Sequence, residues 1–209
     1  MTEIILIRHG ETEWNVSNIF RGRLDIALNE NGIKQAEQLA EYLSHWKIDA
    51  IYSSPLKRAL QTAETVARPH KLPVQLSPGL TDFDFGKWQG LSRKEVNEKY
   101  KEIYADWLER PHLVQMPDGE NLGDVRKRAL ATLDEILAKN YGAVVIVSHR
   151  VINKVLICAL LGLDDSHFWN IEQDTCGVTM FKHDGKRFIL ARHNDTSFMN
   201  RKKMPSVDF

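Results

Sequence analysis

The 209-residue sequence has no net charge, only two cysteines and no long apolar run. Lys plus Arg and Asp plus Glu both total 28, so no overall field attracts nucleic acid or a membrane surface. Cys158 and Cys176 lack a CxxC spacing, which predicts reduced thiols rather than a disulfide framework or a structural zinc site. The N-terminal apolar run, residues 4–7, stops at Arg8 and is too short for a signal peptide. We therefore expect a cytoplasmic protein with neither nucleic acid nor a membrane as partner.

The sequence also lacks a Gly/Ser-rich or Pro-rich linker, a low-complexity segment and an internal repeat. No such feature divides the sequence into separate units, so we expect one domain over residues 1–209. The most polar stretch, from about residue 91 to 119, has the composition of a helical lid-type insertion. Residues 201–209 are basic and then polar, and are expected to be loosely held.

Short aliphatic runs alternate with helical periods along the chain. Residues 4–7 and 143–147 are typical of strands covered on both faces in a parallel sheet, and residues 50–52 predict another strand. After that strand, Ser54 is expected to cap a helix that begins at Pro55 and reaches about residue 67. Two further helical faces are predicted from Ile33, Ala36, Leu39, Ala40 and Leu43, and from Leu122, Val125, Ala129, Leu133 and Ile136.

Residues 175–181 and 187–193 predict two antiparallel strands joined by a turn at Asp184-Gly185. The alternation of strands and helices before them is typical of an α/β fold. We therefore predict a three-layer sandwich, with a mostly parallel central sheet, helices on both faces and an antiparallel C-terminal edge.

Polar side chains follow three of the predicted parallel strands. One strand leads into Arg8-His9, another into His149, and the strand at 50–52 leads to Arg58 on the following helix. The carboxyl ends of parallel strands meet at one edge of a sheet, where ligands bind. Two arginines, whose planar forks match phosphate oxygens at any physiological pH, predict a pocket for a phosphate group.

A neutral imidazole can attack phosphorus directly without a metal, and His9 is placed for that role. The arginines would neutralise charge on the transferring group, and His149 would hold one of its oxygens. The leaving oxygen needs a proton. Asp82 and Asp84, two residues apart and on one face of an extended segment, are the candidates for that acid.

Residues 6–15, Leu-Ile-Arg-His-Gly-Glu-Thr-Glu-Trp-Asn, closely resemble the signature that opens the histidine phosphatase superfamily, in its phosphoglycerate mutase-like branch. The resemblance covers nearly the whole chain. It implies that His9 is the phosphorylated nucleophile, that Arg8, Arg58 and His149 complete the phosphate pocket, and that Asn15 is an auxiliary phosphate contact. Further blocks in family order are Gly22 with Asp25 and Leu28, residues 52–59 with Thr62, residues 85–90, residues 147–149 and residues 194–196.

Three positions depart from the family pattern. The acid of this branch is usually glutamate, where this chain has Asp82; we keep Asp82 as the acid, with Asp84 as the alternative. Arg21 replaces the common glutamine before Gly22, and Arg150 replaces the glycine after the second histidine. Both arginines suit a substrate with a carboxylate. Asn15, Arg21 and Gly22 are assigned to substrate binding.

The predicted activity is phosphomonoester hydrolysis through a phosphohistidine, with a small-molecule phosphate ester as the partner and no metal or cofactor. A cofactor-dependent phosphoglycerate mutase is the alternative, although residues 91–119 lack the arginine pair and proline-rich stretch of those mutases. An inactive binding module is the second alternative. Within the phosphatases, residues 84–90 resemble α-ribazole phosphatases, and residues 107–112 with 160–163 resemble metal-independent phosphoserine phosphatases.

Several aromatic residues have more than one interpretation. Tyr100, Tyr104, Trp107 and Leu108 are expected to pack a helix onto the body or to cap the substrate, and His112 is a candidate for the substrate entrance. A possible homodimer contact is predicted at an exposed apolar strip formed by Phe168, Trp169 and Ile171.

Overall fold

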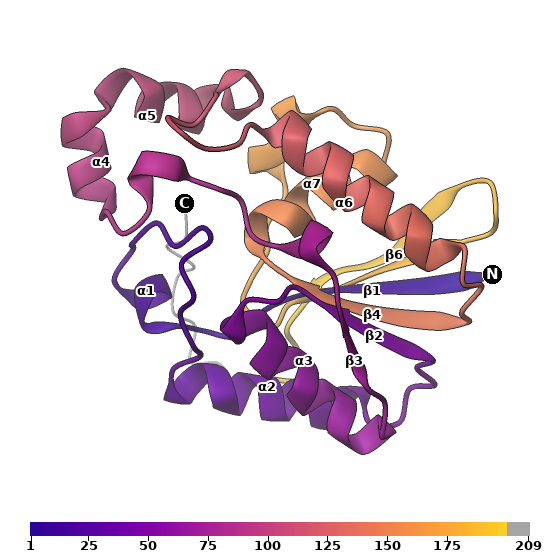
Figure 1. Cartoon of the computed structure of the whole chain (residues 1–209). Coiled ribbons are helices and arrows are strands. Elements are labelled where there is room, and N and C mark those ends of the chain that lie inside the picture. Colours follow the sequence, from indigo (N-terminus) through magenta and orange to yellow (C-terminus); the bar gives the residue numbers. More distant parts are fainter. Residues whose placement is uncertain (200–209) are drawn as a thin grey trace.

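The computed structural model describes residues 1–199, so the expectation for residues 201–209 lies outside the described part of the chain. A six-stranded sheet of order β3-β2-β4-β1-β5-β6 forms its centre (Figure 1). The predicted mostly parallel sheet with an antiparallel C-terminal edge is confirmed. The parallel strands are β1 (Thr2–Arg8), β2 (Ala50–Ser53), β3 (Val74–Leu76) and β4 (Ala143–Ser148), and the antiparallel ones are β5 (Val178–His183) and β6 (Phe188–Asp195).

Two long helices cover each face of the sheet, α2 with α3 on one and α6 with α7 on the other (Figure 1). No helix within residues 1–199 is both long and apolar enough to cross a bilayer. The α-helices are α1 (Glu13–Val16), α2 (Glu30–Leu43), α3 (Lys57–His70), α4 (Arg93–Lys99), α5 (Lys101–Glu109), α6 (Leu122–Leu137) and α7 (Arg150–Leu160).

Successive residues of the central strands enter two different apolar clusters. Ile4 and Leu6 of β1 belong to the cluster with α6 and α7, whereas Ile5 and Ile7 belong to the cluster with α2 and α3. All four are fully buried, because side chains alternate across a sheet that is covered on both faces. This burial explains the unbroken aliphatic runs and confirms the three-layer arrangement.

Two details of the predicted helices are wrong. Helix α3 begins at Lys57 with Leu56 as its N-cap, not at Pro55 with Ser54, and it continues to His70. The Ser54 side chain instead lies 2.7 Å from a histidine of the pocket described below. Ile33 is 46% exposed, because the first turn of α2 turns Gly32 rather than Ile33 toward the backbone of the loop after β1.

Strand β5 begins at Val178, three residues later than predicted. The preceding Cys176 has a left-handed backbone, with φ of 54°, which interrupts the extended strand. Its N–H donates to the Arg8 carbonyl at 3.0 Å. Cys158 and Cys176 are both buried and do not form a disulfide with each other, and burial raises the pKa of the Cys158 thiol to about 11.

The polar segment at 91–119 contains α4, α5 and a 3₁₀ turn at Pro111–Leu113. Figure 1 shows α4 and α5 beyond the carboxyl ends of the strands, at the end of the molecule opposite the start of β1. Tyr104 and Trp107 are buried in the core, as predicted, whereas Leu108 is exposed. The segment is therefore anchored to the body by its aromatic side chains.

The apolar strip predicted at 168–171 is packed against the core, and none of its three apolar side chains is fully exposed. Phe168 is fully buried, with its ring 5.4 Å from that of Trp107, and Trp169 and Ile171 pack against the same core. These side chains pack between α5 and the rest of the core. The strip therefore does not support a homodimer contact.

Candidate active site

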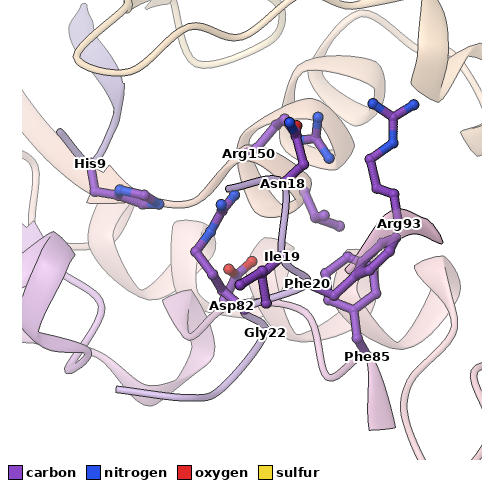
Figure 2. A pocket seen from close by; sticks show the side chains of 11 residues that line it. His9, Asn18, Ile19, Phe20, Gly22, Asp82, Phe85, Arg93 and Arg150 are labelled. Carbon is purple, nitrogen blue, oxygen red and sulfur yellow. The ribbon is translucent and has the colours of Figure 1, made fainter. Parts of the chain in front are cut away.

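A pocket opens at the carboxyl ends of the parallel strands, with about 470 Å³ of empty space that is partly open to solvent. Figure 2 shows His9 and Asp82 directed into it. Of the predicted site residues, it also contains Arg21, Gly22 and Arg150 in its lining. The sequence-predicted residues from four separate parts of the chain therefore meet in one place.

The imidazole of His9 is held in one tautomer by its own loop. Its Nδ1 lies 2.6 Å from the Gly10 carbonyl oxygen, and because a carbonyl only accepts, Nδ1 carries the proton. The other ring nitrogen, Nε2, is then left with a lone pair. Gly10 makes this loop possible, since a Cβ at that position would lie 2.6 Å from the Gly32 carbonyl oxygen.

His149 follows β4 and faces His9, with 5.2 Å between the ring centroids. Its Nε2 lies 2.7 Å from the Ser54 hydroxyl, and its Nδ1 lies 3.5 Å from a carboxylate oxygen of Asp82. The Ser54 hydroxyl also accepts the Leu56 backbone N–H at 3.3 Å. Ser54, predicted as a helix cap, is therefore a partner of the second histidine.

Arg58 is fully buried beneath the pocket. Its guanidinium donates to the backbone carbonyls of Gly22 and Leu24 at 2.7 and 2.9 Å, and to the Asp82 carboxylate at 2.8 Å. Arg8 is equally buried and donates to the Gln173 carbonyl at 2.7 Å. Both guanidinium groups are thus fixed in direction by backbone oxygens before any substrate binds.

The two candidate acids have different surroundings. Asp82 lines the pocket and contacts Arg58 and His149, and its second oxygen accepts the Phe83 N–H at 2.8 Å. Asp84 is not in the lining; it accepts the Gly86 N–H at 2.9 Å and lies 3.4 Å from Arg23. The geometry therefore favours Asp82 over Asp84.

Arg128 of α6 holds the segment that carries Asp82. It donates to the carbonyls of Gly79, Thr81 and Asp82 at 2.8, 2.6 and 3.2 Å. Glu120 accepts two hydrogen bonds from the same guanidinium, at 2.9 and 3.0 Å, which fixes its plane. The position of Asp82 in the pocket thus depends on a clamp from a helix distant in sequence.

Burial and positive charge keep both histidines neutral. Desolvation is the main cause that lowers the pKa of His9 well below its usual value, followed by the charge of Arg58. Desolvation and Arg58 likewise lower the pKa of His149. A neutral His9 retains its Nε2 lone pair at neutral pH, which is the form required for nucleophilic attack.

Other predicted residues have weaker or different connections to the pocket. The amide oxygen of Asn15 accepts the Thr12 N–H and hydroxyl, both at 2.9 Å, in the capping box of α1, and Asn15 is not in the pocket lining. His112 is exposed in the 3₁₀ turn and does not line the pocket either. Gly22 does line it, with a left-handed φ of 51° that suits glycine.

The structure adds residues that the sequence did not single out. Asn18 and Phe20 from the loop after α1, and Arg93 at the start of α4, complete the wall of the pocket. No spacing rule connects them to the strand ends, so only the folded chain reveals them. In residues 1–199, no group of three or more His, Cys, Asp or Glu side chains is arranged to hold a metal ion.

Comparisons with known proteins show which chains this one is similar to. The model of the histidine phosphatase superfamily (branch 1) matches residues 4–196. Phosphoserine phosphatase 1 of Hydrogenobacter thermophilus is 39% identical over 197 residues, covering 94% of this chain and 93% of that protein. The metal-independent phosphoserine phosphatase of Arabidopsis thaliana is 37% identical over 153 residues, covering 71% and 64%. A phosphoserine phosphatase variant from Entamoeba histolytica, solved with phosphoserine, gives a TM-score of 0.82 at 32% identity and covers 95% of this chain and 100% of its own.

Proposed function

The chain belongs to branch 1 of the histidine phosphatase superfamily and is a phosphatase of small phosphate esters, and we propose that it hydrolyses them without a metal through a phosphohistidine at His9. One observation carries the proposal. The hydrogen bond from Nδ1 of His9 to Gly10 leaves Nε2 as a lone-pair donor in a pocket that it shares with Asp82, beside Arg8, Arg58 and His149.

In the first step, Nε2 of His9 forms a bond to phosphorus as the bond from phosphorus to the ester oxygen breaks. Arg8, Arg58 and His149 stabilise the charge on the other three oxygens. Asp82, in its protonated form, gives its proton to the leaving alkoxide.

In the second step, Asp82 is ionised and accepts a proton from a water molecule. The resulting hydroxide attacks phosphorus, the bond to Nε2 breaks, and inorganic phosphate leaves with His9 restored to its neutral form. The same carboxyl group thus acts first as an acid and then as a base. It loses a proton to the leaving group in the first step and regains a proton from water in the second.

Phosphoserine is the substrate that we favour. Two of the similar proteins carry that name, one of them in a match over nearly the whole of both chains, and a third was solved with phosphoserine bound. The pocket supports a compact substrate, since Phe20 and Phe85 close one side of it. We further propose that residues 91–119 cover the substrate, because Arg93 of this segment lines the pocket. The two cysteines, which do not form a disulfide, support a cytoplasmic setting.

Trapping the intermediate tests the nucleophile. The enzyme is mixed with phosphoserine labelled with ³²P, quenched in alkali within milliseconds and digested, and we expect acid-labile label on the peptide that contains residue 9. His9→Ala should carry no label and should keep the circular dichroism spectrum of the unchanged protein. Label on another residue, or full turnover by His9→Ala, would contradict the proposal.

The mutase alternative predicts a different product balance. With 3-phosphoglycerate and catalytic 2,3-bisphosphoglycerate, we expect inorganic phosphate to be released and little 2-phosphoglycerate to form. Isomerisation faster than phosphate release would establish the mutase instead. Absence of both products, and of a labelled residue 9 with a panel that includes α-ribazole 5′-phosphate, would leave the inactive binding module.

A further inference from the structure

Two polar side chains outside the pocket reach the loop after β1, residues 9–12, which carries His9. Gln35 of α2 is 8% exposed and Thr62 of α3 is fully buried, and neither lines the pocket. Both helices cover the same face of the sheet (Figure 1), and both side chains bind the backbone of residues 10 and 11. The proposed reaction assigns no step to either side chain.

Gln35 holds the peptide group that carries the hydrogen-bond acceptor of His9. Its amide oxygen accepts the Glu11 N–H at 2.9 Å. That N–H belongs to the same trans peptide as the Gly10 carbonyl, and in a planar trans peptide the N–H and the C=O point in opposite directions. The bond to Gln35 therefore directs the Gly10 carbonyl toward Nδ1 of His9, 2.6 Å away.

Thr62 holds the preceding peptide group. Its hydroxyl oxygen accepts the Gly10 N–H at 3.0 Å, and the hydroxyl proton is donated to the Arg58 carbonyl oxygen at 2.8 Å, one helical turn earlier. Because the proton of this hydroxyl is committed to Arg58, its oxygen is available to accept from Gly10. The peptide groups on the two sides of the Gly10 Cα are thus held by one side chain each.

The close approach of α2 to this loop depends on a glycine. A Cβ on Gly32 would lie 2.0 Å from the Glu11 carbonyl oxygen, so a larger residue would push the first turn of α2 away. The carbonyl and the carboxylate of Glu11 also accept the backbone N–H and the side-chain amide of Asn29, the N-cap of α2, at 3.0 and 2.9 Å. The loop is therefore bound to the start of α2, which brings Gln35 within reach of it.

We propose that Gln35 and Thr62 are positioning residues for the nucleophile, which hold His9 in the tautomer that keeps the lone pair on Nε2. This inference rests on the proposed phosphohistidine reaction and explains how the reactive tautomer is maintained before a substrate binds. The hydrogen bond at one ring nitrogen decides which nitrogen carries the proton. When the Gly10 carbonyl turns away, Nδ1 loses its acceptor, and a proton that moves to Nε2 blocks attack on phosphorus.

The tautomer is measured directly, without substrate. Long-range ¹H–¹⁵N spectra of protein with ¹⁵N-labelled histidine distinguish a protonated ring nitrogen from one with a lone pair, and the His9 signals are those missing from His9→Ala. We expect a protonated Nδ1 in the unchanged protein and a mixture of tautomers in Gln35→Met, which loses the acceptor for Glu11. Gln35→Glu keeps an acceptor oxygen and should restore the single tautomer. A His9 that stays protonated on Nδ1 in both Gln35→Met and Thr62→Val would overturn the proposal.

Steady-state kinetics test the consequence for turnover. We expect Gln35→Met and Thr62→Val each to lower kcat about tenfold with little change in KM, because the arginines that bind phosphate stay in place. Thr62→Ser keeps the hydroxyl and should recover most of the activity, and the two Thr62 variants test the inference on their own if Gln35→Met does not fold. The loss should be equal for phosphoserine and for p-nitrophenyl phosphate, since His9 attacks both. A loss confined to phosphoserine would indicate a displaced acid and overturn the proposal.

Gln61→Met is the matched control. Gln61 precedes Thr62 on α3, and its amide oxygen accepts the Leu28 N–H at 2.9 Å, so the change removes the same kind of hydrogen bond from a different loop. We expect it to leave the His9 tautomer unchanged. A mixture of tautomers in this control as well would show general loosening and overturn the specific role of Gln35 and Thr62.

The positioning role and the reaction can fail separately. Label at residue 9 in the unchanged protein, together with a tautomer that does not respond to the variants of Gln35 and Thr62, would overturn the positioning role and leave the phosphatase function intact. A tautomer that responds to these variants, without label at residue 9, would support the hold on the imidazole and contradict the proposed reaction.

Discussion

The two ends of the pocket are built in different ways. The phosphate end consists of four residues that are at most 1% exposed, Arg8, His9, Arg58 and His149. They lie at the ends of two central strands, directly after those strands, or on α3. Backbone carbonyls hold three of their side chains. At the outer end, Asn18 comes from the loop after α1 and Arg93 from the seven-residue helix α4, and both are only partly buried, whereas Phe20 and Arg150 are buried.

This difference separates the residues that we expect to carry out the reaction from those that we expect to select the substrate. The phosphate end is rigid because the sheet and its backbone oxygens define each direction, so it can serve any phosphate ester. Asn18 and Arg93 of the outer end lie on a loop and a short helix, which can change without disturbing the sheet. Changes at the phosphate end should therefore lower kcat for every ester, whereas changes at the outer end should alter the choice of substrate.

Asp82→Asn should cause the largest loss. We expect kcat for phosphoserine to fall about 100- to 1,000-fold, the range for loss of a general acid. The kcat of Asp84→Asn should stay within about threefold of that of the unchanged protein. With p-nitrophenyl phosphate, whose leaving group needs no proton, the loss should be much smaller. Steady-state assays of the two variants with both esters measure this. Equal losses in Asp82→Asn and Asp84→Asn would remove the distinction between the two carboxylates.

Arg128→Met should have the next largest effect, through the position of Asp82. Without the clamp on the carbonyls of residues 79, 81 and 82, we expect kcat for phosphoserine to fall on the order of tenfold with little change in KM. Arg128→Lys should recover part of the activity. The neighbouring Lys127 is exposed, and Lys127→Met should leave kcat unchanged. A purely structural role would reduce hydrolysis of p-nitrophenyl phosphate equally, which is the result that would contradict positioning.

The phosphate end should also make stability depend on pH. The pKa of His9 is lowered in the folded protein, so below about pH 6.5 the unfolded chain binds a proton that the native state does not. The free energy of unfolding therefore falls as pH decreases, by up to about 1.4 kcal/mol per pH unit for this histidine. The free energy of unfolding in urea is measured between pH 5 and 7.5 for the unchanged protein and for His9→Asn. It should fall more steeply with decreasing pH in the unchanged protein than in the variant. Parallel curves would contradict burial of a neutral imidazole.

Ser54→Ala should give the smallest effect, because it removes one hydrogen bond from His149 and leaves the ring in place. We expect kcat/KM to fall about three- to tenfold for phosphoserine and phosphoethanolamine alike, the value of a single hydrogen bond. Equal loss for both esters would place Ser54 at the phosphate end. A loss confined to phosphoserine would mean that the two ends are coupled through His149.

Much of the phosphate end could be predicted from the sequence, as could Arg21 and Arg150 in the lining, whereas Asn18, Phe20 and Arg93 could not. Aliphatic runs followed by Arg8-His9 and His149 predict strand ends, and parallel strand ends meet at one edge whatever the loops do. Arg93 lies on α4, which leads directly into α5, and α5 is held by Trp107 packing against Phe83 and Phe168. Contacts between distant aromatic residues leave no periodic pattern in the sequence.

Two wrong predictions have the same origin. Ser54-Pro55 has the composition of a helix start, and Phe168-Trp169-Ile171 that of an apolar surface strip. In the folded chain the Ser54 hydroxyl meets His149 from 95 residues away, and Phe168 is buried under Trp107. Local propensity describes what a segment favours alone, and tertiary partners decide which option it takes.

The sequence by itself determined the order of strands and helices, the burial of both sheet faces and the meeting of Arg8, His9, Arg58 and His149, because side-chain alternation and strand direction are local properties of the backbone. Only the tertiary structure distinguished Asp82 from Asp84, joined Ser54 to His149 and placed Arg93 in the lining of the pocket. Those choices depend on the direction of side chains across distances that no local rule spans.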